Sequence, residues 1–150
     1  VWGICGNLGG GKTLTAVSMA VEALYCGYYV VSNVTLNMGE LTKVIPWADK
    51  LYTHIVVRNE QYDENGNLIK CEDFNPFTIP SGSPRGTDGG KRVLVILDEC
   101  AEWFDQYSNL KSKSISRVMS WLRHSSKRSQ DVVFLILLVV LAIWLCFFLF

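Results

Sequence analysis

A glycine-rich run near the N-terminus carries the residue types that bind phosphate. Gly6-Asn7-Leu8-Gly9-Gly10-Gly11-Lys12-Thr13 matches the spacing G-x-x-x-x-G-K-[ST] at every fixed position. Glycines let the backbone wrap so that several N–H groups point at one phosphate, and a helix starting near Gly11 would add the positive end of its dipole. We expect Lys12 to reach the β- and γ-phosphates and the Thr13 hydroxyl to bind Mg²⁺. The run therefore predicts a P-loop in which residues from Gly6 to Leu14 bind the nucleotide.

Two adjacent acids form the second part of the predicted site. Asp98 and Glu99 follow the apolar run Val93–Leu97, and a carboxylate at the carboxyl end of a parallel strand lies at the ligand edge of an open α/β sheet. Asp98 is suited to hold Mg²⁺ opposite Thr13, and Glu99 to orient or deprotonate the attacking water. The alternative interpretation is a strand that ends in two solvated acids. Together with the P-loop, the pair points to nucleotide hydrolysis, with Lys12 and Glu99 as catalytic residues.

The elements around these residues predict a three-layer α/β domain of the P-loop NTPase class, with a mainly parallel sheet, over residues 1–136. Apolar runs predict buried strands at 1–5, 28–32, 93–97 and 132–136. Helical spacing of apolar residues predicts one helix from about Leu14 to Leu24, with Gly27 as its C-cap, and another from Ser114 to Ser126. The first strand, loop, helix and second strand have the length of a βαβ unit.

The segment between residues 39 and 90 is less regular. Residues 39–51 suit a short helix interrupted near Pro46, and residues 55–61 read as a strand. Asn65-Gly66 is a hairpin-turn signal before a strand at 67–71. Residues 75–90 are dense in Pro, Gly, Ser and Asp, which predicts a loop.

Charge, cysteines and histidines narrow the classes of function. The 150 residues include 14 basic and 14 acidic side chains, so the net charge gives no whole-surface attraction to nucleic acid or anionic lipid. Five scattered cysteines favour free thiols in a reducing compartment over a disulfide framework. His54 and His124 are isolated from each other and from the cysteines, which disfavours a metal role.

Two further groups of side chains have both a functional and a structural interpretation. Arg117, Arg123 and Arg128 could include an arginine finger for the γ-phosphate of a neighbouring subunit, or they could form the solvated face of a helix. The second group comprises Trp103, Phe104 and Trp121, with Leu122 beside them. We expect these side chains to pack in a core or an interface rather than to form a base-stacking platform.

With both parts of the site identified, the sequence resembles the zonular occludens toxin family, which includes the assembly ATPases of filamentous phages. The resemblance rests on the P-loop run and on residues 31–34 (VSNV), 97–104 (LDECAEWF), 121–125 (WLRHS) and 130–136 (QDVVFLI). The stretches 98–104 and 121–136 are the specific part, because a P-loop alone belongs to many families.

The resemblance implies a host inner-membrane protein whose nucleotide domain lies in the cytoplasm. It implies that ATP hydrolysis with Mg²⁺ drives phage assembly and export. Phage coat and assembly proteins, an outer-membrane channel and a phage DNA complex are the implied partners, and we expect a homo-oligomer. Lys12, Thr13, Asp98 and Glu99 take the roles argued above.

The C-terminal residues depart from the family's pattern. The family normally has a polar residue, often Gln, after the last of these strands, whereas residues 137–150 are an uncharged hydrophobic tail. Together with 132–136 this tail is close to the roughly 20 residues that cross a bilayer, and the basic residues before it place its N-terminal side in the cytoplasm. The tail is therefore a candidate transmembrane segment. The alternatives are a buried strand and core helix of a truncated domain, an altered reading frame, or a chain cut short. A strand and a membrane helix cannot share residues 132–136.

Other functions stay open at this point. One is a viral DNA-packaging or DNA-translocating ATPase, which would show hydrolysis stimulated by DNA. Another is a membrane interaction protein that does not hydrolyse nucleotide. A toxin is indicated only by the family name.

Overall fold

A five-stranded parallel sheet forms the centre of the computed structural model, which describes residues 1–7, 9–56, 58–66, 68–73, 75–83, 90–98 and 113–137. The strand order is β1, β7, β6, β2 and β3, and each neighbouring pair is parallel. In that order the strands are Trp2–Gly6, Gln130–Leu137, Val93–Leu97, Tyr29–Ser32 and Tyr52–His54. The predicted α/β class with a mainly parallel sheet is confirmed.

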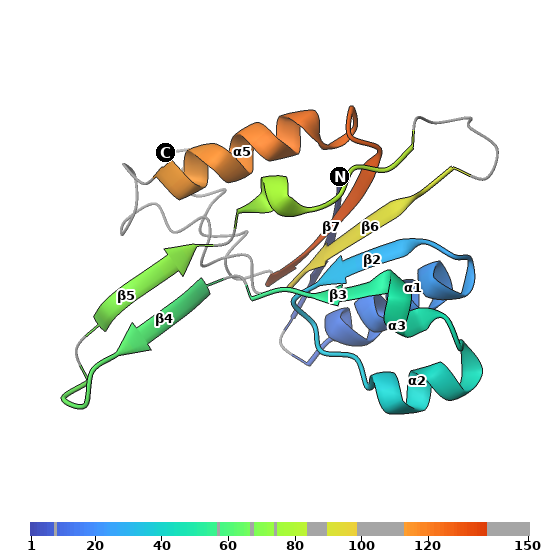
Figure 1. The fold of residues 1–150 in the computed structure, drawn as a ribbon, viewed down its shortest axis with the longest axis horizontal. Helices are drawn as coiled ribbons and strands as arrows, with labels where there is room; N and C mark the ends of the chain where they lie inside the picture. Colours follow the sequence, from blue (N-terminus) through green and yellow to red (C-terminus); the bar gives the residue numbers. More distant parts are fainter. Residues whose placement is uncertain are drawn as a thin grey trace.

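Helices cover both faces of this sheet (Figure 1). On one face lie α1 (Lys12–Tyr25), α2 (Met38–Val44) and α3 (Ala48–Leu51), and on the other lie α5 (Lys113–Ser125) and the short 3₁₀ helix η1 (Pro76–Thr78). The C-cap of α1 is Cys26, one residue before the predicted Gly27. Gly27 follows it with a φ of 79°, and its amide bonds to the Leu24 carbonyl at 3.0 Å. The helix interruption near Pro46 is confirmed, since Pro46 lies between α2 and α3.

The two sides of the sheet have separate hydrophobic cores. Successive residues of β6 alternate between them, so that Leu94 and Ile96 pack towards α1 while Val93, Val95 and Leu97 pack towards α5. All five residues of β6 are buried, as expected for a strand covered on both faces. The fully buried Trp121 of α5 belongs to the second core, which confirms its predicted packing role.

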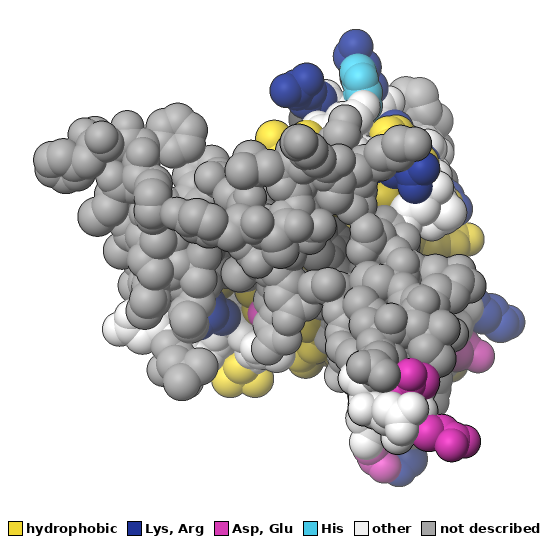
Figure 2. Space-filling view, turned by 90° about the vertical axis from the view of Figure 1, so that its left-hand side faces the viewer, with side chains coloured by type: hydrophobic (Ala, Val, Ile, Leu, Met, Phe, Trp, Pro, Cys, Tyr) yellow, Lys and Arg dark blue, Asp and Glu magenta, His cyan; other side chains and the backbone are white. Residues whose placement is uncertain are grey.

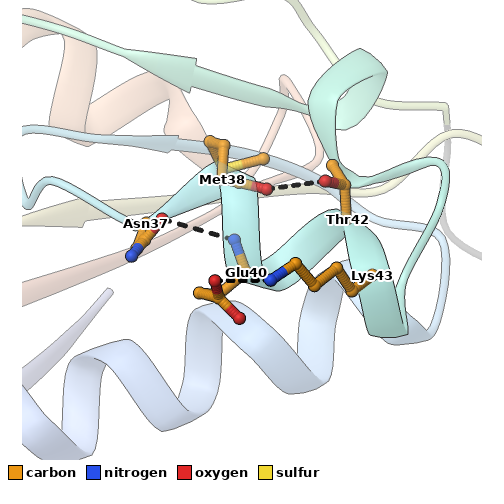
Figure 3. Close-up of polar contacts among 5 residues, drawn as sticks. All are labelled: Asn37, Met38, Glu40, Thr42 and Lys43. Carbon is orange, nitrogen blue, oxygen red and sulfur yellow. Dashed lines mark hydrogen bonds and ion pairs between the residues drawn. The ribbon is translucent and has the colours of Figure 1, made fainter.

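Local side-chain contacts shape the small helix α2 at the surface. Asn37 precedes the helix and accepts a hydrogen bond from the Glu40 amide at 3.3 Å (Figure 3). Lys43 pairs with the Glu40 carboxylate at 2.6 Å, and both side chains are exposed. An exposed pair of this kind contributes little to stability.

Two predictions about the strands were wrong. The first strand was expected to be buried, but β1 lies at one edge of the described sheet and the Trp2 side chain is 67% exposed. The strand predicted at 55–61 starts too early, because residues 55 and 56 lie in no strand. The main-sheet strand β3 ends at His54, and β4 (Arg58–Tyr62) pairs with β5 (Leu68–Asp73) in an antiparallel hairpin that projects from the main sheet (Figure 1). The hairpin turn at Asn65-Gly66 is confirmed, with Gly66 at a φ of 81°.

Residues 132–136 resolve the conflict between a strand and a membrane helix. They belong to β7, whose extended backbone pairs with β1 on one side and β6 on the other. A membrane helix therefore cannot include them, and the part of that prediction that placed 132–136 in the span was wrong. Residues 138–150 lie outside the described part of the chain. None of the helices described by the structure is long and apolar enough to cross a membrane.

Candidate nucleotide-binding site

The loop after β1 has the tight curvature that its glycines predict. Asn7 accepts a backbone hydrogen bond from the Gly10 amide at 3.0 Å, which closes a turn immediately after the strand. Gly9 and Gly11 adopt φ values of 74° and 77°, in the left-handed region that side chains disfavour. Leu8, also predicted to bind nucleotide, lies outside the described residues. The loop therefore uses glycine at positions where other residues would be strained.

The first turn of α1 directs its backbone amides towards the same loop. Gly11 is the N-cap, and the ladder of the helix starts with the Thr15 amide bonding to the Gly11 carbonyl at 2.9 Å. The amides of Lys12, Thr13 and Leu14 precede that bond, and a helix offers no internal acceptor to its first N–H groups. The Leu14 side chain is 74% exposed, so any contribution of this residue to binding would come from its amide. Such a helix end favours anions.

Lys12 lies across the loop. Its Nζ donates to the Gly6 carbonyl at 2.9 Å and to the Asn7 carbonyl at 2.8 Å. These two bonds tie the helix start to the end of β1 and hold the ammonium beside the turn. A positive charge is thereby fixed next to the amides of the loop, where an anion would bind.

Thr13 and Asp98 are brought together although 85 positions separate them in the sequence. The Thr13 hydroxyl donates to Asp98 Oδ2 at 3.0 Å. Asp98 directly follows β6, and because the strands are parallel its carboxyl end lies at the same sheet edge as the end of β1. A hydroxyl and a carboxylate oxygen are the hard ligands that Mg²⁺ prefers, so the two residues fit the ion predicted for them. The described residues contain no group of three or more His, Cys, Asp or Glu able to hold a metal.

Asn33 also contacts Asp98, and sequence reasoning missed it. Its Oδ1 accepts from the Asp98 amide and its Nδ2 donates to the Asp98 carbonyl, both at 2.8 Å. Asn33 follows the last residue of β2, the neighbour of β6. The signal that could have found it is its position, as a polar residue at the carboxyl end of a predicted buried strand.

Strand β7 lies between the two parts of the site. Its residue Leu137 is opposite Gly6 at the start of the loop, and Phe134 is opposite Leu97 just before Asp98. The sequence at this end of β7 is Leu135-Ile136-Leu137, so the polar residue that the family resemblance led us to look for is not within the strand. Glu99, the predicted water-orienting residue, lies outside the described residues.

The three arginines considered as fingers differ in their surroundings. Arg117 and Arg123 are exposed on α5. Arg128 instead donates to the carbonyls of Ile79 at 2.6 Å and Phe77 at 3.3 Å, and its guanidinium lies 5.6 Å from the Phe77 ring centroid. Arg128 is therefore held by the segment that contains η1, and its contacts explain it as a packing residue.

Cys5 and Cys26 are free thiols.

Comparison with known proteins decides the family. A model of the zonular occludens toxin (Zot) family matches residues 4–138. The chain belongs to the Zot family. This confirms the resemblance drawn from the P-loop, acidic and Trp-Leu-Arg-His stretches. No solved structure matches this Zot-family chain.

Curated relatives of the chain are phage proteins. The Gene 1 proteins of Enterobacteria phage I2-2, Salmonella phage IKe and Enterobacteria phage M13 are 30%, 29% and 28% identical to it, each over 139 residues. The matches cover 91% of this chain but only 34%, 34% and 35% of the three relatives. The chain thus spans about a third of the length of the proteins it matches.

Proposed function

We propose that this Zot-family chain is the ATP-binding and hydrolysing part of a phage morphogenesis protein. The observation that carries the proposal is the contact between Thr13 and Asp98 at 3.0 Å, which joins the P-loop to the end of the buried strand β6. We propose ATP rather than another nucleotide because the resemblance to the family implies ATP. We propose that the process is assembly and export of phage across the host inner membrane, as the family resemblance implies; the Gene 1 relatives are phage proteins.

The site residues divide the work as follows. Backbone amides from Gly6 to Leu14, with Leu8 among them, would hold the phosphates, and the Lys12 ammonium would stabilise negative charge as it develops on the γ-phosphoryl group. Thr13 and Asp98 would hold Mg²⁺, which neutralises phosphate charge when it is bound. Glu99, which follows Asp98 in the sequence, would orient the attacking water.

The proposed partners and location concern a full-length protein. The Gene 1 relatives are about three times as long as this chain. We propose phage coat and assembly proteins, an outer-membrane channel and a phage DNA complex as partners, with a homo-oligomer as the working form. The proposed location is the host inner membrane, with the nucleotide site in the cytoplasm. The apolar residues from 138 to 150 would contribute to membrane attachment.

Two substitutions test this function. Lys12→Ala should weaken binding of a fluorescent ATP analogue about 10- to 100-fold, because it removes charge-assisted hydrogen bonds to phosphate. Glu99→Gln should bind the analogue normally but lose roughly 10²–10⁴ in phosphate release. Lys43→Ala is the matched control, since Lys43 is an exposed lysine that pairs with Glu40 on its own helix. Phage export measured with the same changes in the full-length protein should fall for both site variants, and unchanged turnover and export in both would refute the proposal.

A DNA-translocating ATPase is the second candidate, because α5 and the turn after it present basic side chains to solvent. Arg117, Arg123, His124 and Lys127 are all exposed, and basic and histidine side chains gather at the upper edge of the molecule, at the level of α5 (Figure 2). DNA-stimulated hydrolysis that weakens between roughly 50 mM and 200 mM salt would support this candidate. Hydrolysis unaffected by DNA at both concentrations would exclude it.

A further inference from the structure

We infer that Asn33 is a positioning residue that holds Asp98 in the orientation that faces Thr13. This inference rests on the proposed function, because it concerns how the Mg²⁺ ligand of that site is held. Asn33 belongs to neither the P-loop nor the acidic pair. It acts from the next strand of the sheet, through the backbone of Asp98.

The contact uses both ends of one side-chain amide. The Asn33 oxygen accepts from the Asp98 N–H and the Asn33 nitrogen donates to the Asp98 C=O, each at 2.8 Å. An amide side chain is planar and carries an acceptor and a donor side by side, as a peptide group does. Asn33 therefore satisfies both backbone groups of Asp98, as the opposite residue of an antiparallel hydrogen-bonded pair would.

The pairing lies just beyond the end of the β2–β6 ladder. The last pair of the β2–β6 register is Ser32 with Ile96. After Ser32 the backbone turns, because the Ser32 hydroxyl accepts a hydrogen bond from the Val34 amide at 3.0 Å. The main chain thus leaves β6 while the Asn33 side chain stays beside it.

The backbone of Asp98 is consequently held by hydrogen bonds although the residue lies just beyond the end of β6. Two of its backbone groups are held by Asn33, and its Oδ2 accepts from Thr13. The carbonyl bound by Asn33 belongs to the peptide bond that leads to Glu99. Restricting the Asp98 backbone restricts where its carboxylate can lie, and a metal ligand must be held within about 0.5 Å of its working position.

The test measures Mg²⁺ binding separately from nucleotide binding. A fluorescent ATP analogue is titrated into the chain without metal, and Mg²⁺ is then titrated into the complex. Asn33→Ala should leave metal-free binding within about twofold of the unsubstituted chain, and should raise the Mg²⁺ concentration for half-maximal change about tenfold. Asn33→Gln, which keeps the amide but lengthens the side chain, should shift the Mg²⁺ requirement in the same direction and guards against failure of the alanine variant to fold.

Asn37→Ala is the matched control, because Asn37 also uses its side chain to bond a backbone amide but does so at α2. It should leave the Mg²⁺ requirement unchanged. Asp98→Asn supplies the second background, in which Asn33→Ala should alter the Mg²⁺ requirement less than about twofold, because the carboxylate that Asn33 positions through the backbone is gone.

The outcomes separate the two proposals. If the unsubstituted chain and the Lys12→Ala variant bind the analogue equally, the nucleotide function fails and the role of Asn33 fails with it. If nucleotide binding depends on Lys12 but Asn33→Ala and Asn33→Gln leave the Mg²⁺ requirement unchanged, only the Asn33 inference is overturned. It is also overturned if Asn33→Ala shifts the requirement by the same factor with and without Asp98→Asn.

Discussion

Replacing Gln130 by leucine tests how the second core joins α5 to the sheet. Gln130 begins β7 and is 3% exposed. Its Oε1 accepts from the Trp121 indole N–H at 2.8 Å, and its Nε2 donates to the Pro80 carbonyl at 2.9 Å. One side chain therefore links the helix, the strand and the segment after η1. Leucine has a similar size and removes both contacts.

The magnitude follows from which partners can recover a hydrogen bond. Trp121 is fully buried, so its indole N–H would be left without an acceptor at a cost of about 1–3 kcal/mol. Pro80 is exposed, and water can replace the lost donor there at little cost. The Ile79 carbonyl, 3.3 Å from the same amide, keeps its bond from Arg128 at 2.6 Å. We therefore expect a loss of about 2 kcal/mol and a fall in Tm of roughly 4–8 °C.

Urea unfolding followed by tryptophan fluorescence measures this loss, and thermal unfolding followed by circular dichroism checks it. The decisive comparison repeats Gln130→Leu in a Trp121→Phe background. The indole N–H is then absent, so the cost of Gln130→Leu should fall below about 0.5 kcal/mol. An equal cost in both backgrounds, or an unchanged urea midpoint in the single variant, would refute the reasoning.

Substitutions at three further positions have expected outcomes. Thr13→Val should remove most of the Mg²⁺ dependence of nucleotide binding, whereas Thr13→Ser, which keeps a hydroxyl, should retain it within about threefold; equal titrations would contradict a ligand role. Gly82→Ala should cost about 1–3 kcal/mol in urea unfolding, because a Cβ there would lie 2.6 Å from the Ser129 carbonyl and 2.8 Å from that of Lys91. Burial raises the pKa of Tyr52 above its ordinary 10.0, against an opposing backbone hydrogen bond. The folded state therefore favours the protonated phenol, so stability should be full below pH 10 and decline as pH rises through the raised pKa. Tyr52→Phe should remove that part of the decline in urea midpoints, and an identical alkaline profile would exclude Tyr52 as its source.

Much of the fold could be predicted because local pattern governs it. The apolar spacing in α1 and α5 and the continuous run of β6 predicted those elements to within about two residues at each end. The edge position of β1 could not be predicted, because an apolar run does not reveal which strands will pair beside it. The structure inserts β7 and β6 between β1 and β2, so the predicted βαβ unit crosses two strands that come much later in the chain.

The site shows the same division between local and distant information. Motif spacing specifies the loop, because glycine φ values and the helix start are local properties, and the position after a buried strand predicted Asp98. Asn33 is different, since its partner lies 65 positions away. Polar residues follow many strands, and only the β2–β6 pairing makes this one adjacent to Asp98.

The pairing of strand β7 also determines how a force applied to the chain would reach the site. It pairs with both β1 and β6. It therefore connects the strand that leads into the phosphate loop to the strand that precedes Asp98. A pull along its axis would shear both ladders and change the separation of Thr13 and Asp98, now 3.0 Å between their oxygens. The chain continues from Leu137 directly into the residues proposed to meet the membrane. Tension at the envelope and the state of the nucleotide would then both act at the carboxyl end of β7, where Leu137 lies opposite Gly6.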